Sequence, residues 1–115
     1  RMNEQDFQQQ VLDLATRLGY AHFHTFDARR SEPGWPDLVL AHREKGRVIF
    51  AECKRDTEKT TPAQDAWLET LAWCDEEVYI FRPRDLDEIV DILTLPQKPS
   101  KYARMELKTA VVKID

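Results

Sequence analysis

Two acidic residues on either side of a predicted turn have the types and spacing of a catalytic pair. The polar residues 43–46 end in a glycine and are typical of a four-residue hairpin turn. If His42 pairs with Arg47 across this turn, counting outward sets Asp37 directly opposite Glu52, with the two Cβ atoms roughly 5 Å apart. The sequence therefore predicts that two carboxylates meet at one end of a sheet.

A basic residue beside these acids completes a set suited to phosphodiester hydrolysis. Lys54 follows Glu52 by two positions, so both side chains share one face of the strand. Neighbouring carboxylates repel each other, and a divalent cation between them satisfies both; oxygen ligands favour Mg²⁺ or Mn²⁺ over zinc. Lys54 would orient or help deprotonate the attacking water and offset charge on the phosphate. The alternative is incidental charges at an exposed strand end, or a Glu52–Lys54 ion pair.

Two further polar side chains fall on the apolar faces of predicted helices. Glu4 shares a row with Phe7, Val11, Leu14 and Leu18, and Gln64 shares one with Trp67, Leu68 and Leu71. A polar group that faces inward needs a partner, so Glu4 would bind the metal directly or through water, and Gln64 would hydrogen-bond to a carboxylate, the lysine or the phosphate. Alternatively, Gln64 completes a capping box with Thr61, and Glu4 is a first-turn acid favoured by the helix dipole.

The elements that must position these side chains indicate a small α/β fold. Apolar spacing predicts three helices, and runs of β-branched and aromatic residues between turns predict four strands. The helices are expected over residues 3–18, 61–74 and 85–94, and the strands over 21–26, 36–41, 48–51 and 78–81. Thr61 and Asp85 are the expected caps of the second and third helices. The predicted order is αβββαβα, with the second and third strands antiparallel.

Residues 95–115 follow the predicted domain, which spans residues 3–94. The segment ends with strand-forming residues, Val111, Val112 and Ile114. Their pattern gives them no place in the core. The segment would be an extra strand, an arm that packs on a partner subunit, or a loosely held tail.

The composition fits one globular domain without a membrane or redox function. Of the 115 residues, 42% are hydrophobic and 33% are charged, and apolar runs such as 38–41 are too short to cross a membrane. The first residues lack the apolar run of a secretory signal, so we expect a cytoplasmic protein. Cys53 and Cys74 lack the spacing of a zinc site or disulfide framework, so we expect reduced and partly buried thiols.

The net charge of -4 argues against binding nucleic acid by bulk electrostatics, because phosphate neutralisation needs local lysine and arginine. Basic residues that would supply a local positive charge around the acids are Arg29, Arg30, Arg55, Lys59, Arg82 and Arg84. Trp35 would stack on a splayed base, or would cap the core instead. His22, His24 and His42 are left outside the site, because solvated histidines are the commoner case.

The motifs occur together with a spacing that is more specific than any one of them. They are Gly34-Trp35-Pro36-Asp37, the turn at 43–46, Glu52-Cys53-Lys54, and Thr61-Pro62-Ala63-Gln64 with Trp67 and Leu68. Together they resemble the PD-(D/E)XK nucleases and, within them, the virus-type replication-repair nuclease (VRR-NUC) domain. The likeness covers residues 3–94. It implies a restriction-endonuclease-like αβββαβα core, with a central mixed sheet flanked by helices.

The resemblance also implies a role for each matching residue. The positions that hold the metal in the family match Asp37, Glu52 and the backbone carbonyl of Cys53. Lys54 matches the catalytic lysine, and Gln64 matches the family's glutamine. Glu4 matches the acid of the first helix, with Asp6 as the other candidate. DNA contacts are expected from Arg29, Arg30, Trp35, Arg55 and Lys59.

The activity implied by the resemblance is that of an Mg²⁺- or Mn²⁺-dependent endodeoxyribonuclease. Small stand-alone members look like virus-encoded enzymes, similar to Holliday-junction resolvases that act as homodimers, so the implied substrate is branched DNA. Two symmetric cuts across a four-way junction call for two active sites related by a twofold axis. The alternatives are a catalytically idle DNA-binding or scaffold module, and a nuclease that prefers flaps or a particular sequence.

Overall fold

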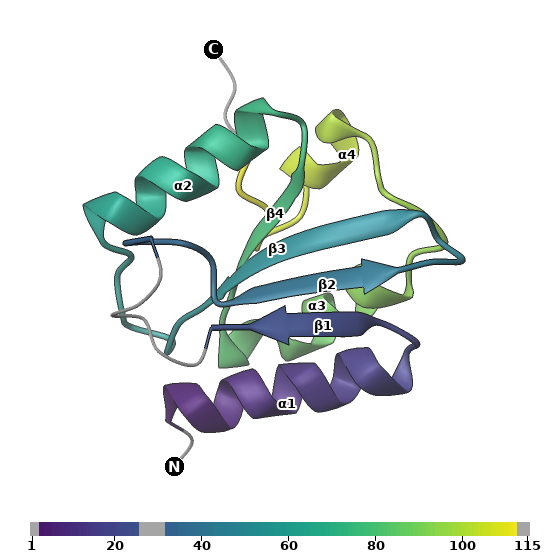
Figure 1. Cartoon of the computed structure of the whole chain (residues 1–115), viewed down its shortest axis with the longest axis horizontal. Coiled ribbons are helices and arrows are strands. Elements are labelled where there is room, and N and C mark those ends of the chain that lie inside the picture. Colours follow the sequence, from purple (N-terminus) through teal and green to yellow (C-terminus); the bar gives the residue numbers. More distant parts are fainter. Residues whose placement is uncertain (1–2, 26–31, 113–115) are drawn as a thin grey trace.

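The computed structural model describes residues 3–25 and 32–112, which form a four-stranded mixed sheet flanked by helices (Figure 1). The elements are α1 (Glu4–Arg17), β1 (Ala21–His24), β2 (Leu38–His42), β3 (Arg47–Cys53), α2 (Pro62–Trp73), β4 (Glu77–Phe81), α3 (Leu86–Thr94) and α4 (Lys101–Met105), with a 3-10 turn at Pro83–Asp85. The predicted αβββαβα order is confirmed, and α4 is an addition to it.

The sheet has the strand order β1-β2-β3-β4. Its first three strands pair antiparallel and β4 pairs parallel to β3, a connection that requires the crossover supplied by α2. His42 lies opposite Arg47 and Leu38 opposite Ala51, which confirms the predicted hairpin register. β2 begins at Leu38 rather than near Pro36; proline has no N–H to donate to a neighbouring strand, so the ladder starts after it.

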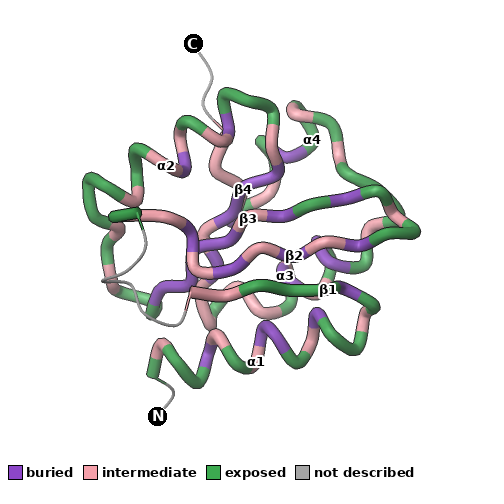
Figure 2. The backbone as a smooth tube through the Cα atoms, viewed as in Figure 1, coloured by how far each residue is buried: buried purple, intermediate pink, exposed green. Residues whose placement is uncertain are grey.

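Alternate residues of the sheet face two separate cores. On one face, Ile49, Ala51 and Cys53 of β3 join the cluster formed with α1 and α3. On the other face, Phe50 packs with Leu68 and its neighbours beneath α2. Burial is concentrated along β3 and β4, while β1 lies largely exposed at the edge (Figure 2). Helices therefore cover both faces of the sheet at β3 and β4, and Glu52 points to the α2 side.

A buried polar network fixes the end of the sheet where β3 and β4 begin. Arg47 donates two hydrogen bonds to the carboxylate of Glu77, at 2.9 and 2.6 Å. The Tyr79 hydroxyl donates to the same carboxylate, and Arg47 also donates to the Tyr20 hydroxyl at 3.0 Å. Tyr20 in turn donates to the carbonyl of Leu93 at 2.8 Å. Both charges of the buried ion pair are therefore fully supported by partners.

The C-terminal segment packs on the outer edge of β4. The Ile80 amide donates to the Thr109 carbonyl at 3.1 Å, and the Val111 amide donates to the Val78 carbonyl at 3.0 Å, so the segment pairs antiparallel through Ala110. The contact is a single β-bridge between Tyr79 and Ala110 and not a full strand, so among the three alternatives it comes nearest to the extra strand. Arg104 of α4 is buried and forms an ion pair with Asp75 at 2.6 Å, which ties the segment to the turn before β4.

Three local expectations meet different outcomes. The Thr61 capping box with Gln64 is confirmed. Asp85 is the N-cap residue of α3, as predicted, but its side chain makes no cap hydrogen bond within the described ranges, because the 3-10 turn at Pro83–Asp85 leads directly into α3. Both cysteines are free, with Cys53 fully buried and Cys74 exposed rather than partly buried.

Within residues 3–25 and 32–112, no helix has the length and apolar character needed to cross a bilayer.

Candidate active site

Asp37 stands at the position just before β2, held by the backbone of both neighbouring strands. Its carbonyl accepts a hydrogen bond from the Thr25 amide at 3.2 Å, and its carboxylate Oδ2 accepts one from the Cys53 amide at 2.9 Å. The continued hairpin register places Asp37 across from Glu52. The carboxylate therefore lies at the end of β3, where the sequence predicted it.

Glu52 is a buried acid, and one of its two carboxylate oxygens has no hydrogen-bond partner among the described residues. Its side chain is 1% exposed, Oε2 accepts a hydrogen bond from Gln64, and Oε1 has no hydrogen-bond partner among the described residues. Burial, followed by the proximity of the Asp37 carboxylate, raises the pKa of Glu52 to about 9, while Lys54 acts in the opposite direction. Two acids thus share a desolvated corner that holds one negative charge more easily than two.

Gln64 takes part in both interactions that the sequence allowed for it. Its side-chain oxygen accepts a hydrogen bond from the Thr61 amide at 2.9 Å, which completes the capping box of α2. Its side-chain nitrogen donates to Glu52 Oε2 at 2.9 Å. Because one amide group supplies both contacts, the start of α2 and the buried acid are joined directly.

Gly34 explains how the first turn of α2 comes so close to the loop before Asp37. It has a φ of +83°, and a Cβ at this position would lie 2.3 Å from the carbonyl carbon and oxygen of Ala63. Only glycine fits this backbone conformation and this close approach without strain. The glycine of the motif thus sets the distance between Asp37 and Gln64, a role that the sequence pattern by itself did not reveal.

Lys54 follows Glu52 and is almost fully buried. Its charge favours the ionised form of Glu52, and its ammonium lies 3.9 Å from the carboxylate of Glu58. Glu58 was not among the predicted residues, because it stands in a charged loop without periodicity. Arg82, from the end of β4, donates to the carbonyls of Arg55, Asp56 and Glu58 and so holds this loop in place.

Glu4, rather than Asp6, faces the site. Burial, a hydrogen bond with Glu58 and repulsion from that acid and Asp37 raise the pKa of Glu4 to about 7. The interaction with Glu4 lowers the pKa of Glu58, so of the two carboxyls Glu4 is the one that takes up a proton more readily. Asp6 instead completes the capping box of α1 with Asn3. Glu4 therefore lines the rim of the site, beside a pocket of about 330 Å³ that also contacts Arg55.

The donor set fits a hard divalent cation. Asp37 and Glu52 offer carboxylate oxygens, and the unpartnered Oε1 of Glu52 is an oxygen ligand without a proton donor. No three His, Cys, Asp or Glu side chains of the described ranges form a group that could hold an ion by themselves. One or two carboxylates, completed by waters and substrate oxygens, are nevertheless the usual protein contribution to a magnesium site. The arrangement suits Mg²⁺ or Mn²⁺ better than zinc, which takes three or four protein ligands.

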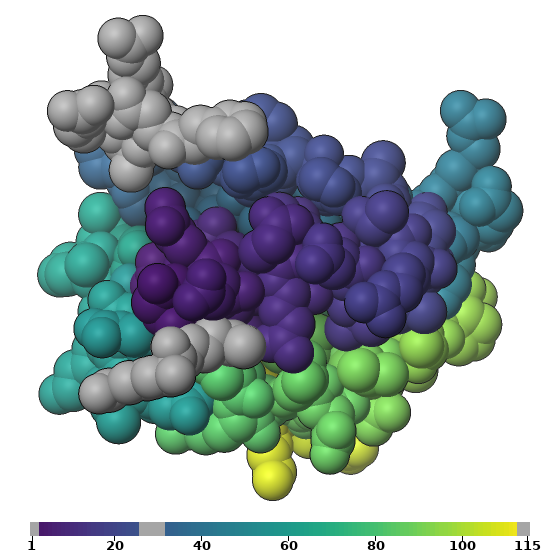
Figure 3. Space-filling model, turned by 90° about the horizontal axis from the view of Figure 1, so that it is seen from below, coloured from purple at the N-terminus to yellow at the C-terminus, as the bar shows by residue number. Residues whose placement is uncertain are grey.

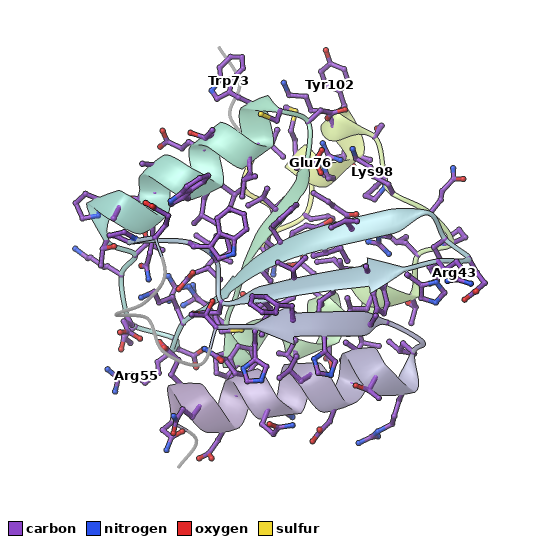
Figure 4. The ribbon with its side chains drawn as sticks, viewed as in Figure 1. Arg43, Arg55, Trp73, Glu76, Lys98 and Tyr102 are labelled. Carbon is purple, nitrogen blue, oxygen red and sulfur yellow. The ribbon has the colours of Figure 1, made fainter. Side chains whose placement is uncertain are left out.

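The predicted DNA contacts are distributed unevenly. Arg55 is exposed and projects from the loop after β3 (Figure 4), and Lys59 is exposed farther along the same loop. Trp35 packs edge-on against Trp67 and Phe50, with ring centroids 4.9 and 5.8 Å away, which matches the core-capping alternative. Two other predicted contacts, Arg29 and Arg30, lie outside the described residues.

Comparison with known families and structures gives four findings. The family model described as the VRR-NUC domain matches residues 1–85. A solved structure described as a VRR_NUC domain protein is similar, with a TM-score of 0.61 and 21% identity over 80% of this chain and 85% of that chain. The Holliday junction resolvase Hjc of Archaeoglobus fulgidus, an archaeal hyperthermophile, aligns with a TM-score of 0.48 and 20% identity over 68% of this chain and 67% of that chain. No curated protein sequence matches the chain.

Proposed function

The chain belongs to the VRR-NUC domain family, and on that premise we propose that it is a metal-dependent endonuclease that hydrolyses phosphodiester bonds in DNA. The observation that carries the proposal is the meeting of Asp37 and Glu52 at the end of β3, with Lys54 buried beside them. A buried carboxylate with a raised pKa and an unpartnered oxygen is costly for folding, so its presence is best explained by a functional ligand.

Each residue of the site has a distinct task in this proposal. A bound Mg²⁺ or Mn²⁺ would supply Lewis acidity at the phosphate and lower the pKa of the attacking water. Asp37, Glu52 and the Cys53 carbonyl hold the ion, and Gln64 keeps the Glu52 carboxylate oriented through its 2.9 Å hydrogen bond. Lys54 orients the attacking water and offsets negative charge on the phosphate. Glu4 contributes from the rim, directly or through a water.

The preferred substrate in this proposal is branched DNA, cut by a homodimer. The described part of the chain carries one candidate site. Cutting two strands of a four-way junction symmetrically requires two such sites related by a twofold axis. Light scattering on the purified protein tests the oligomeric state, and a monomer at all concentrations would contradict the dimer.

Cleavage of a labelled DNA panel tests the proposed activity. The protein is incubated with Mg²⁺ or Mn²⁺ and four-way junctions, flaps or plain duplex, and products are mapped. Cutting is expected with the parent protein and is lost in Asp37→Asn and Glu52→Gln. Glu44→Gln, in the exposed hairpin turn, serves as the matched control and retains activity. Two results together would contradict the nuclease: the parent cuts none of these DNAs, and both site variants bind them with the same affinity as the parent. The protein would then be an idle DNA-binding module.

A further inference from the structure

A pocket of about 360 Å³ lies between the end of β4 and the C-terminal segment. The residues that line it are Ile80, Arg82, Arg84, Asp85, Lys108, Thr109, Ala110 and Val111. Residues 108–111 lie beyond residues 1–85, the part of the chain that the family model matches. The pocket is therefore built jointly by the shared domain and by this chain's own extension.

The lining carries an excess of positive charge. Arg82, Arg84 and Lys108 contribute three cations, and Asp85 contributes one carboxylate. The neighbouring acid Glu88 is already engaged, because its carboxylate accepts the amides of Lys108 and Thr109 at 2.7 and 3.0 Å. Guanidinium and ammonium donors around one hollow match an anion with several oxygen acceptors.

Two of the lining residues have unused hydrogen-bonding capacity. The ammonium of Lys108 forms no hydrogen bond or ion pair with any residue of the described ranges. Thr109 is 4% exposed, and its hydroxyl oxygen is buried without a partner among the same residues. Lys108 is exposed, so its free ammonium is available to a ligand without being unusual. A buried hydroxyl without a partner, such as that of Thr109, is uncommon in stable proteins and calls for an explanation, such as a ligand.

We propose that this pocket binds a phosphate group and, in the complex with DNA, holds a backbone phosphodiester away from the bond that is cut. The DNA part of the proposal rests on the proposed function. The chain as a whole carries a net charge of -4, so affinity for DNA has to come from local basic clusters of this kind. Arg82 links the pocket to the candidate site, because it also binds the carbonyls of the loop that follows Lys54.

Figure 3 shows where α3 and the extension lie relative to α1. Viewed from below in Figure 3, α1 crosses the face, and the segment after β4 with α3 adjoins it in green. The C-terminal residues, in yellow, emerge at the edge beyond α3.

Titration with inorganic phosphate tests the pocket without any nuclease activity. Backbone amide resonances of Arg82, Arg84 and residues 109–111 are expected to shift on addition of phosphate, and those of α4 are expected to stay in place. Thr109→Val removes an unpartnered hydroxyl, so it should leave the melting temperature unchanged or higher while it weakens phosphate binding. A lower melting temperature with unchanged phosphate binding would mean that the hydroxyl has only a structural role and would overturn the proposal.

Binding of labelled four-way junctions and duplex in metal-free buffer tests the DNA arm, because no cleavage occurs there. Lys108→Ala is expected to weaken binding about fivefold and to reduce the slope of log affinity against log salt by about 0.9, the value for one phosphate contact on duplex DNA. Lys101→Ala, in the same extension but on the Trp73 side, is the matched control. If Lys108→Ala and Lys101→Ala weaken DNA binding equally, the phosphate site is refuted, even if the parent cuts DNA. If only Lys108→Ala weakens binding and the parent cuts no DNA, the nuclease proposal is refuted and the phosphate site stands.

Discussion

At the scale of single residues, the two most buried acids of the sheet have opposite surroundings. Glu77 is fully paired by Arg47 and Tyr79, and Glu52 shares its corner with a second acid and keeps one oxygen unpartnered. The first arrangement satisfies a charge within the protein. The second is stable as a neutral carboxyl, or with a cation, which makes Glu52 the residue where ligand binding and folding are coupled.

The metal-free protein is expected to lose stability as the pH rises. Folding raises the pKa of Glu52 from 4.5 to about 9, so between these values the folded state keeps a proton that the unfolded state has released. The unfolded state then binds fewer protons, and the free energy of unfolding falls with pH across this window. Thermal denaturation in a chelating buffer at pH 5, 7 and 9 measures the slope.

Glu52→Gln provides the control for that slope. The variant is expected to show a smaller pH dependence, with a remainder from Glu4, whose pKa is about 7. An equal slope in parent and variant would contradict the assignment. In the parent, added Mg²⁺ or Mn²⁺ should release protons on binding, because the ligand must be ionised.

Lys54→Ala is expected to separate chemistry from metal binding. The substitution removes a charge that acts on the phosphate but no oxygen ligand, so cleavage should fall at least about a hundredfold. Metal affinity, measured by calorimetry, should fall less than about tenfold, since Lys54 also favours the ionised form of Glu52. Lys101→Ala controls for the loss of one positive charge. A collapse of metal affinity would show that Lys54 mainly organises the acids.

At the scale of elements, the contact between Gly34 and the first turn of α2 decides where Gln64 lies. Gly34→Ala would force a Cβ to within 2.3 Å of the Ala63 carbonyl at a positive φ. We expect a loss of about 3 kcal/mol of folding stability, together with reduced cleavage, because α2 must move away from Glu52.

Gly46→Ala is the matched control for this contact. Gly46 also has a positive φ, of +58°, but its Cβ would meet nothing within 4 Å in the described part of the chain. A loss of only about 1 kcal/mol is expected, from the backbone conformation alone, with cleavage unchanged. Denaturant titration of both variants gives the comparison, and equal losses would disprove a specific role for the Gly34 contact.

The sequence predicted most elements because their signals are local. Apolar periodicity located α1 and α2, and the hairpin register followed from counting outward from the turn between β2 and β3. The start of α3 at Asp85 was predicted correctly, but its lack of a side-chain cap was not, because Asp85 ends a 3-10 turn, a feature that side-chain identity does not encode. α4 was missed because five residues after two prolines carry too little periodicity.

At the scale of the whole molecule, the position of the acidic pair could be predicted, but its surroundings could not. Asp37, Glu52 and Lys54 follow from one hairpin, whereas the loop that carries Glu58 is held at the site by Arg82, from a distant segment. The place of the C-terminal segment likewise depends on an open edge of β4, which exists only once the sheet is assembled. Long-range pairing of this kind leaves no periodic signal in the sequence.

Deletion of residues 107–115 tests the structural contribution of the extension. The deletion removes the backbone hydrogen bonds with Val78 and Ile80. It also removes the packing of Leu107 and Ala110 against the larger core and of Val111 against the smaller core beneath α2. A loss of at least about 2 kcal/mol in the free energy of unfolding is expected, with greater self-association through the uncovered strand. Glu106→Ala, at an exposed position, is the control for denaturant titration and light scattering. Unchanged stability would show that the segment only rests on the surface.

The Arg47–Glu77 network gives the two ends of the sheet different resistance to local opening. Where β3 and β4 begin, a guanidinium, a carboxylate and two phenols brace each other, so amide protons there should exchange with solvent only when the entire domain unfolds. At the other end, where the acids Asp37 and Glu52 meet, amide protons should exchange faster through local opening, until an ion or a nucleic acid binds there. The rigid end of the sheet at Arg47 and Glu77 thus keeps the fold intact while the end that carries Asp37 and Glu52 changes conformation on binding.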